Sequence, residues 1–200
     1  KKIDKLPEES LHRKFKLLRD ELYYGPEKEI LDDWATDFFD RDGKIVREFQ
    51  TTFHSSFWEI YLHKVFQTLG YKTLDKYPHP DFIINSPFNL YIEAVVSEIK
   101  KGGIPECNRT IDDVMKVFDD ITTQPDYDQV ICEGIVRSSN SITKKLKAYK
   151  NKYVKESYID TKTPYVIALS SYGQINYGSE YIYSIIPLLY GFVFNNKNKV

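Results

Sequence analysis

The sequence predicts an α/β fold in which a central mixed sheet is flanked by helices. Short, almost wholly apolar runs alternate along the chain with stretches whose apolar residues recur at helical spacing. Continuous apolar runs of this kind are typical of strands that are covered on both faces. The 200 residues are 42% hydrophobic and 28% charged, a composition that indicates a soluble globular domain with a buried core.

Two of the predicted strands form a hairpin. Residues 81–84 and 90–96 are rich in β-branched and aromatic side chains, and the turn-forming residues 85–87 lie between them. Further strands are predicted over residues 71–74 and 165–169. Because side chains alternate between the two faces of a strand, residues near opposite ends of the hairpin sequence can share one face.

Helices are predicted before and after the hairpin. Two short, highly charged helices form an N-terminal segment over residues 1–45, and the main domain is predicted over residues 46–200. Within the main domain, helices are predicted over residues 55–69, 110–121 and 141–153. Ser141 is expected to cap the last of these helices. The apolar run 181–194 is shorter than the about 20 residues that cross a bilayer, and it is predicted to be buried core.

Charge and cysteine content exclude several kinds of protein. A formal net charge of −1 argues against a histone-like nucleic-acid binder, although it allows a local basic patch. Cys107 and Cys132 form no CxxC pair, so they offer neither a zinc framework nor a disulfide-rich scaffold. Residues 1–20 are charged throughout, unlike a signal peptide. We therefore expect a cytoplasmic protein that does not associate with membranes.

Two carboxylates on the hairpin are the strongest indication of chemistry. Asp81 opens the first strand, and Glu93 interrupts an apolar run in the second. A carboxylate in such a strand costs free energy unless it is paired or bound to a metal, and two bare carboxylates about 4 Å apart repel each other by roughly 1–4 kcal/mol. A divalent cation such as Mg²⁺ would remove this repulsion. Alternatively, Glu93 forms a salt bridge or points out of an edge strand, and Asp81 is only a turn residue.

The residues around these carboxylates form a recognisable motif. Pro80-Asp81, a hairpin and then Ile92-Glu93-Ala94 resembles the signature of the PD-(D/E)xK nuclease superfamily. In that signature a proline–aspartate pair is followed, after a spacer, by an acid two residues before a lysine. The resemblance covers roughly residues 47–170 and implies a restriction-endonuclease-like core.

The same resemblance implies a metal site and an activity. The helix that includes residues 53–62 is similar to the first core helix of restriction-endonuclease-like domains, where a glutamate often completes the metal site, and Glu59 matches that position. The family would therefore assign Mg²⁺, or Mn²⁺, to Asp81, Glu93 and Glu59. The implied reaction is hydrolysis of phosphodiester bonds. DNA is the expected polymer on family grounds, while no residue separates it from RNA.

The sequence departs from the motif at Val95, where the family has its lysine. In such nucleases that lysine is thought to position the attacking water and to stabilise charge at the scissile phosphate. Lys145, at the edge of the inward face of the helix predicted over residues 141–153, is a candidate replacement; alternatively, it only lies along apolar surface. The same helix is expected to contact phosphates through Lys144, Lys147 and Lys150. A solvated helix face explains these lysines almost as well.

The missing lysine leaves two further interpretations open. In one, the chain is a catalytically inactive nuclease-like domain that binds nucleic acid or a protein partner. In the other, it is a structural subunit whose acids form internal salt bridges. Further domains or a partner subunit could accompany the chain in each case.

Overall fold

The computed structural model describes residues 6–41 and 43–192. The chain divides into two compact units. The first consists of Lys1–Ala94 and Tyr158–Val166, and the second of Val95–Ser157 and Ile167–Val200. The boundary between them passes through two neighbouring strands.

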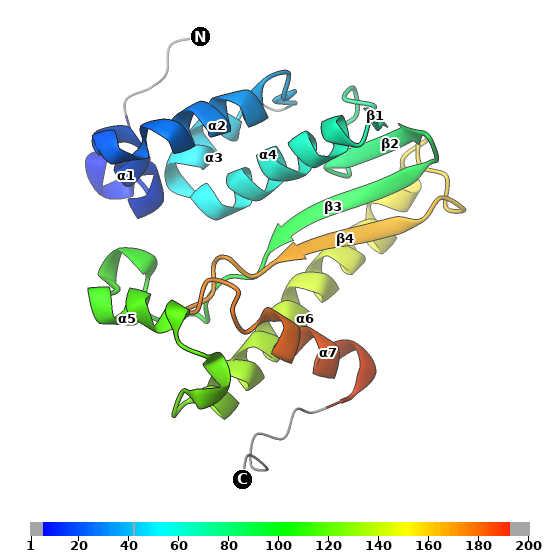
Figure 1. Cartoon of the computed structure of the whole chain (residues 1–200). Coiled ribbons are helices and arrows are strands. Elements are labelled where there is room, and N and C mark those ends of the chain that lie inside the picture. Colours follow the sequence, from blue (N-terminus) through cyan, green and yellow to red (C-terminus); the bar gives the residue numbers. More distant parts are fainter. Residues whose placement is uncertain (1–5, 42, 193–200) are drawn as a thin grey trace. The chain divides into compact units, whose positions relative to one another are not determined.

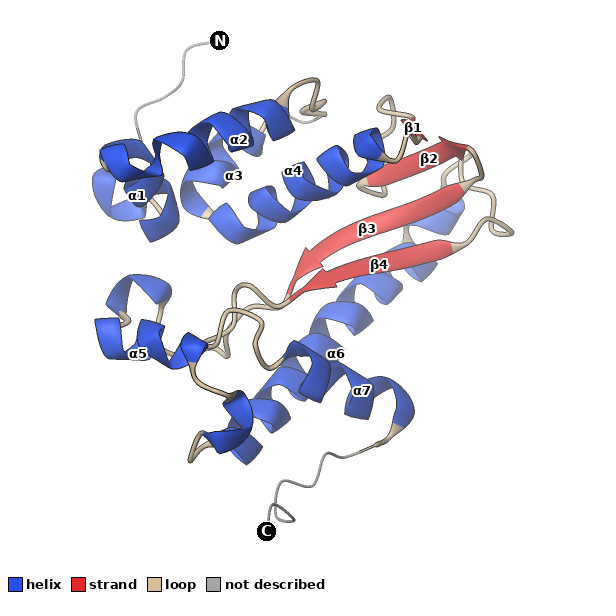
Figure 2. Cartoon of the chain, in the orientation of Figure 1, coloured by secondary structure: helices blue, strands red, loops and turns tan. Residues whose placement is uncertain are grey.

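A mixed, open sheet of four strands in the order β1-β2-β3-β4 is flanked by helices, which confirms the predicted α/β class (Figure 2). Its strands are β1 (Lys72–Thr73), β2 (Phe82–Ser86), β3 (Leu90–Val96) and β4 (Tyr165–Ser170). The first three strands pair antiparallel, and β2 and β3 form the predicted hairpin.

The pairing of β3 with β4 makes the sheet mixed. The Tyr91 N–H donates to the Pro164 carbonyl at 3.0 Å, and the Ser97 N–H donates to the Ser170 carbonyl at 2.6 Å. Both bonds join residues with the same separation in sequence, which is the pattern of parallel strands. The structure confirms the α/β class, whereas the restriction-endonuclease-like core stays a prediction.

The helices of the first unit pack around α4. They are α1 (Arg13–Asp20), α2 (Gly25–Ala35), α3 (Ile45–Thr51) and α4 (Phe53–Thr68), with short 3₁₀ turns at Glu8–Ser10 and Leu22–Tyr24. Both α2 and α3 contact α4 (Figure 1). The helix predicted over 55–69 is α4, and it packs against β2 through the rings of Phe66 and Phe82, whose centroids are 5.1 Å apart.

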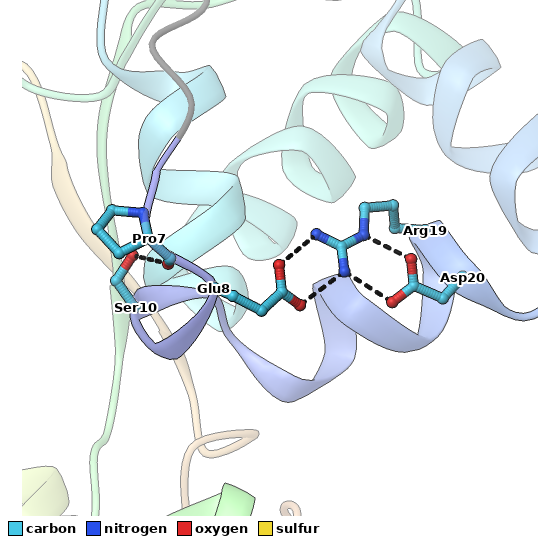
Figure 3. Close-up of polar contacts among 5 residues, drawn as sticks. All are labelled: Pro7, Glu8, Ser10, Arg19 and Asp20. Carbon is cyan, nitrogen blue, oxygen red and sulfur yellow. Dashed lines mark hydrogen bonds and ion pairs between the residues drawn. The ribbon is translucent and has the colours of Figure 1, made fainter.

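An exposed ion-pair cluster fastens the 3₁₀ turn at Glu8–Ser10 to α1 (Figure 3). The Arg19 guanidinium donates to both Glu8 carboxylate oxygens, at 2.7 and 3.0 Å, and its Nη2 donates to Asp20 at 2.7 Å. These hydrogen bonds lower the pKa of both carboxyls and raise the pKa of Arg19. The cluster is solvent-exposed, so it orders the chain locally and contributes little to global stability.

The second unit is built around α6 (Tyr127–Asn151), which begins well before the predicted cap at Ser141. Its other helical elements are Glu106–Asn108, α5 (Ile111–Met115), Lys116–Phe118, Ile121–Thr123, Tyr153–Lys155 and α7 (Tyr181–Tyr190). The early part of α6 buries the small residues Gly134 and Ser138 together with Ile131. Small residues give no apolar periodicity, so the sequence pattern did not predict this half of the helix.

The apolar run predicted as buried core is largely α7. This helix contacts α6, but its fully buried residue is Ser184, while Ile182, Leu189 and Tyr190 are exposed. The prediction is therefore wrong for these side chains, and residues 193 and 194 of the run lie outside the described residues. Within residues 6–41 and 43–192, no helix combines the length and apolar character that crossing a membrane takes.

The contact between α6 and α7 supplies a test of the fold. A Cβ added at Gly134 would lie 3.0 Å from Ser184 Cβ and 3.1 Å from its Oγ. We expect Gly134→Ala to lower the free energy of unfolding by about 1–3 kcal/mol through overpacking, measured by urea denaturation. The matched control is Gly25→Ala in α2, which has no atom within 4 Å of the added carbon and should not be destabilised.

A double variant separates the steric effect from a general loss of helix stability. Combining Gly134→Ala with Ser184→Gly removes both crowded atoms of Ser184, so the two substitutions should be less destabilising together than the sum of their separate effects. Strict additivity of the two would contradict the close approach of the helices.

Candidate active site

The register of the β2–β3 hairpin relates the two predicted carboxylates to each other. Phe82 pairs with Ile92, and Ile83 pairs with Tyr91. Continued by one residue, the same register sets Asp81 opposite Glu93. Directly opposed residues of an antiparallel pair project from the same face of the sheet, which is the arrangement that the sequence suggested.

A hydrogen bond fastens Asp81 to the neighbouring strand. Asp81 lies one residue before β2, and its Oδ2 accepts from the Ala94 N–H of β3 at 2.8 Å. Because Ala94 directly follows Glu93, this bond holds the Asp81 carboxylate beside the backbone of the second acid. The side chain of Asp81 remains 22% exposed and can be reached by solvent.

Glu93 occupies an interior position. It lies in β3, which has a neighbouring strand on each side, and only 2% of the residue is exposed. The alternative in which Glu93 points out of an edge strand is therefore wrong. Both Ile92 and Ala94 are buried with it.

Glu59 and Asp81 line one polar cavity of about 400 Å³ in the first unit. Glu59 comes from α4, while Asp81 and His79 come from the segment that leads into β2. The cavity is also lined by Phe38, Phe39, Asp40, Arg41, Lys44, Ile45, Glu48 and Pro78. Glu93 is absent from the described lining, so its part in the site depends on its pairing position opposite Asp81.

Arg41 is a residue of this cavity that the sequence did not indicate. Its Nη2 lies 3.7 Å from Asp81 Oδ1, and its Nη1 donates to the carbonyl of Pro80 at 2.7 Å. A longer bond of 3.4 Å joins Nη1 to the carbonyl of Tyr77. The guanidinium is thus hydrogen-bonded to the backbone just before Asp81 and forms an ion pair with the Asp81 carboxylate. A single arginine about forty positions away gives no sequence signal for such a contact.

Lys145 lies on α6 in the second unit, whereas the three acids lie in the first. Its proximity to Asp81 and Glu93 stays a prediction. The side chain is half-buried, in agreement with a place at the edge of the inward face of the helix, although the neighbouring Leu146 is 38% exposed. The three lysines expected at phosphates, Lys144, Lys147 and Lys150, are exposed.

No protein-family model, curated protein or solved structure matches this chain. The resemblance to the PD-(D/E)xK superfamily is thus carried by the residues of this chain alone. Among those residues, Asp81 and Glu59 share a cavity, and Glu93 continues the hairpin register opposite Asp81.

The bond between Asp81 and Ala94 predicts different effects for two substitutions. Asp81→Ala leaves the buried Ala94 N–H without its acceptor and should lower the free energy of unfolding by about 1–3 kcal/mol. Asp81→Asn retains a carbonyl oxygen at the same place, so its unfolding midpoint in urea should stay close to that of the unsubstituted protein. Equal losses in the two variants would show that the charge, rather than the hydrogen bond, stabilises this corner.

Proposed function

We propose that this protein is a metal-dependent nuclease that hydrolyses phosphodiester bonds, with DNA as the expected substrate. The observation that carries the proposal is the polar cavity that Asp81 and Glu59 line together. These acids come from separate elements, a helix and the start of a hairpin strand. They are two of the three acids that the PD-(D/E)xK motif assigns to a metal, and the third, Glu93, is buried opposite Asp81 in register.

The donor set fits a hard divalent cation. Asp81, Glu59 and Glu93 offer only carboxylate oxygens, which Mg²⁺ and Mn²⁺ prefer. When bound, such an ion polarises the phosphate and lowers the pKa of a water molecule that attacks it. Asp81 is suited to hold the ion because the Ala94 N–H fixes one of its oxygens in place. The volume of about 400 Å³ leaves room for a phosphate group beside Asp81 and Glu59.

Two cations are candidates for the role of the lysine that Val95 replaces. Arg41 lines the cavity, and a planar guanidinium forms paired hydrogen bonds with phosphate oxygens. In this role it would stabilise charge that develops on the scissile phosphate. Lys145 is the alternative, carried by α6 of the second unit. Parallel substitutions distinguish the two.

Exposed lysines on α6 favour a second candidate function, nucleic-acid binding without cleavage. Lys144, Lys147 and Lys150 are exposed and lie on one long helix. Such a row neutralises phosphates without reading sequence. If Val95 marks a lost activity, this surface would still bind a polyanion.

Cleavage of single- and double-stranded DNA and RNA in Mg²⁺ or Mn²⁺ tests the proposed activity. We expect Asp81→Asn, Glu93→Gln and Glu59→Gln to lower the cleavage rate by roughly 100-fold or more, since each removes a carboxylate proposed to hold the ion that polarises the phosphate. EDTA should abolish cleavage. The control is Glu29→Gln, an exposed acid of α2 outside the cavity, which should leave the rate unchanged. Cleavage that survives Asp81→Asn would overturn the assignment.

The same assay separates the two cations. Loss of cleavage in Arg41→Gln with retention in Lys145→Gln assigns the phosphate-stabilising role to Arg41, and the reverse pattern assigns it to Lys145. Arg41→Lys is a useful companion because it keeps the charge but not the paired donors. If the unsubstituted protein cleaves none of these substrates with either metal, the proposed activity is overturned, and the binding experiment below decides between the inactive binder and a structural subunit.

Binding to duplex DNA at several salt concentrations tests the lysine row. Neutralising Lys144, Lys147 and Lys150 to Gln should weaken binding and reduce the slope of log K against log salt by about 0.9 for each phosphate that the protein no longer neutralises. The charge-matched control neutralises the exposed residues Lys72, Lys116 and Lys162. Equal effects of the two triple variants would mean that net charge, rather than the α6 row, governs binding.

A further inference from the structure

A second cavity, of about 60 Å³ and lined by several polar residues, lies wholly within the second unit. Its lining includes the acids Asp126, Glu133 and Glu180, the amides Gln174 and Asn176, and Lys100. We call it the Glu180 cavity. The residues come from α6 and the Asp126 that precedes it, from the segment between β4 and α7, and from the stretch after β3. Neither the nuclease motif nor the proposed activity uses any of them.

Glu180 is buried with only partial compensation for its charge. It immediately precedes α7, only 1% of it is exposed, and neither of its carboxylate oxygens has a hydrogen-bond partner in the described part of the chain. Burial raises the pKa of this carboxyl. The N–H groups of Glu180 and Gly178, the Ser171 hydroxyl and Arg109 lie near enough to lower the pKa in part, although the carboxylate forms no hydrogen bond of ordinary geometry with them. A buried carboxylate in this state costs free energy unless something binds it.

A second acid of the cavity is only half satisfied. Glu133, on α6, accepts a hydrogen bond from Lys100 Nζ at its Oε2, at 2.8 Å. Its Oε1 is buried and has no hydrogen-bond partner among the described residues. One carboxylate oxygen of Glu133 therefore remains available to a ligand in the cavity.

In both amides of the lining, the nitrogen already donates to an oxygen of another residue. Gln174 Nε2 donates to the carbonyls of Ser97 and Glu98, at 3.1 and 2.7 Å. Carbonyls can only accept, so these bonds fix the orientation of the amide and leave its Oε1 as the remaining acceptor. Asn176 Nδ2 donates to Gln124 Oε1 at 3.4 Å. Both amide residues are almost fully buried.

We propose that the Glu180 cavity binds one divalent cation, Ca²⁺ in preference to Mg²⁺, through Glu180, Glu133 and the amide oxygens of Gln174 and Asn176. A set that contains only oxygen donors suits a hard cation. Four protein ligands favour Ca²⁺, because Mg²⁺ is usually held by one or two carboxylates and keeps several of its waters. The volume of about 60 Å³ accommodates one ion with an accompanying water.

The cation would join parts of the second unit that are distant in sequence. Glu133 lies in α6, whereas the other three ligands lie in the segment that connects β4 to α7. An ion shared between them would tie this segment to α6. Lys100 already compensates part of the charge of Glu133, so its ammonium competes with the ion.

Calorimetric titration of Ca²⁺ into metal-free protein tests the proposal. The Asp81→Asn variant is used throughout, so that binding at the nuclease site does not contribute. One site is expected, together with a rise in the melting temperature on Ca²⁺ addition. Adding Glu180→Gln or Glu133→Gln should weaken binding by roughly tenfold or more and remove the thermal shift. The control is Asp128→Asn, an exposed acid of α6 outside the cavity lining.

A variant that should bind Ca²⁺ more tightly, rather than more weakly, strengthens the test. Lys100→Gln frees the second oxygen of Glu133 and removes a competing charge, so Ca²⁺ should bind roughly threefold tighter or better. If circular dichroism shows that Glu180→Gln does not fold, the test rests on Glu133→Gln and Lys100→Gln, whose residues are less buried. Unchanged Ca²⁺ affinity in Glu133→Gln, or no binding of Ca²⁺ at millimolar concentration, overturns the proposal. Neither result bears on cleavage, which Asp81→Asn tests separately.

Discussion

The antiparallel register of β2 and β3 is the constraint on which the proposed chemistry depends. Because side chains alternate along a strand, a slip of one residue would move Asp81 to the face opposite Glu93. The pairs Phe82–Ile92 and Ile83–Tyr91 define the register that sets the two acids on one face. The bond from Ala94 to Asp81 extends the same register beyond the end of β2.

The N-terminal segment contributes to the site in a way that its sequence did not suggest. Arg41 and Lys44 precede the predicted boundary at residue 45, yet both line the cavity of Glu59 and Asp81. The tether from Arg41 to the Pro80 carbonyl explains how a residue outside the motif reaches the motif. A truncated chain that began at residue 46 would therefore lose basic groups from the cavity together with two helices.

Sequence patterns predicted the helices and strands that form from neighbouring residues. Strand-forming runs indicated the β2–β3 hairpin and β4, and apolar residues at helical spacing indicated α4. The start of α6 could not be predicted, because Gly134 and Ser138 are buried through the small size that lets α7 approach. Asp81 and Glu59 could be named as candidate site residues from a motif, whereas the contact of Arg41 with Asp81 arises only from tertiary folding.

The replacement of the motif lysine by Val95 restricts how any activity could work. An aliphatic side chain in β3 cannot hold a water or a phosphate, so a cation must come from another element. Arg41 can supply a fixed charge with paired donors, but a guanidinium does not take up a proton and so cannot serve as the base that activates water. If Arg41 is the substitute, removal of the proton from the attacking water must rely on the carboxylates and their metal.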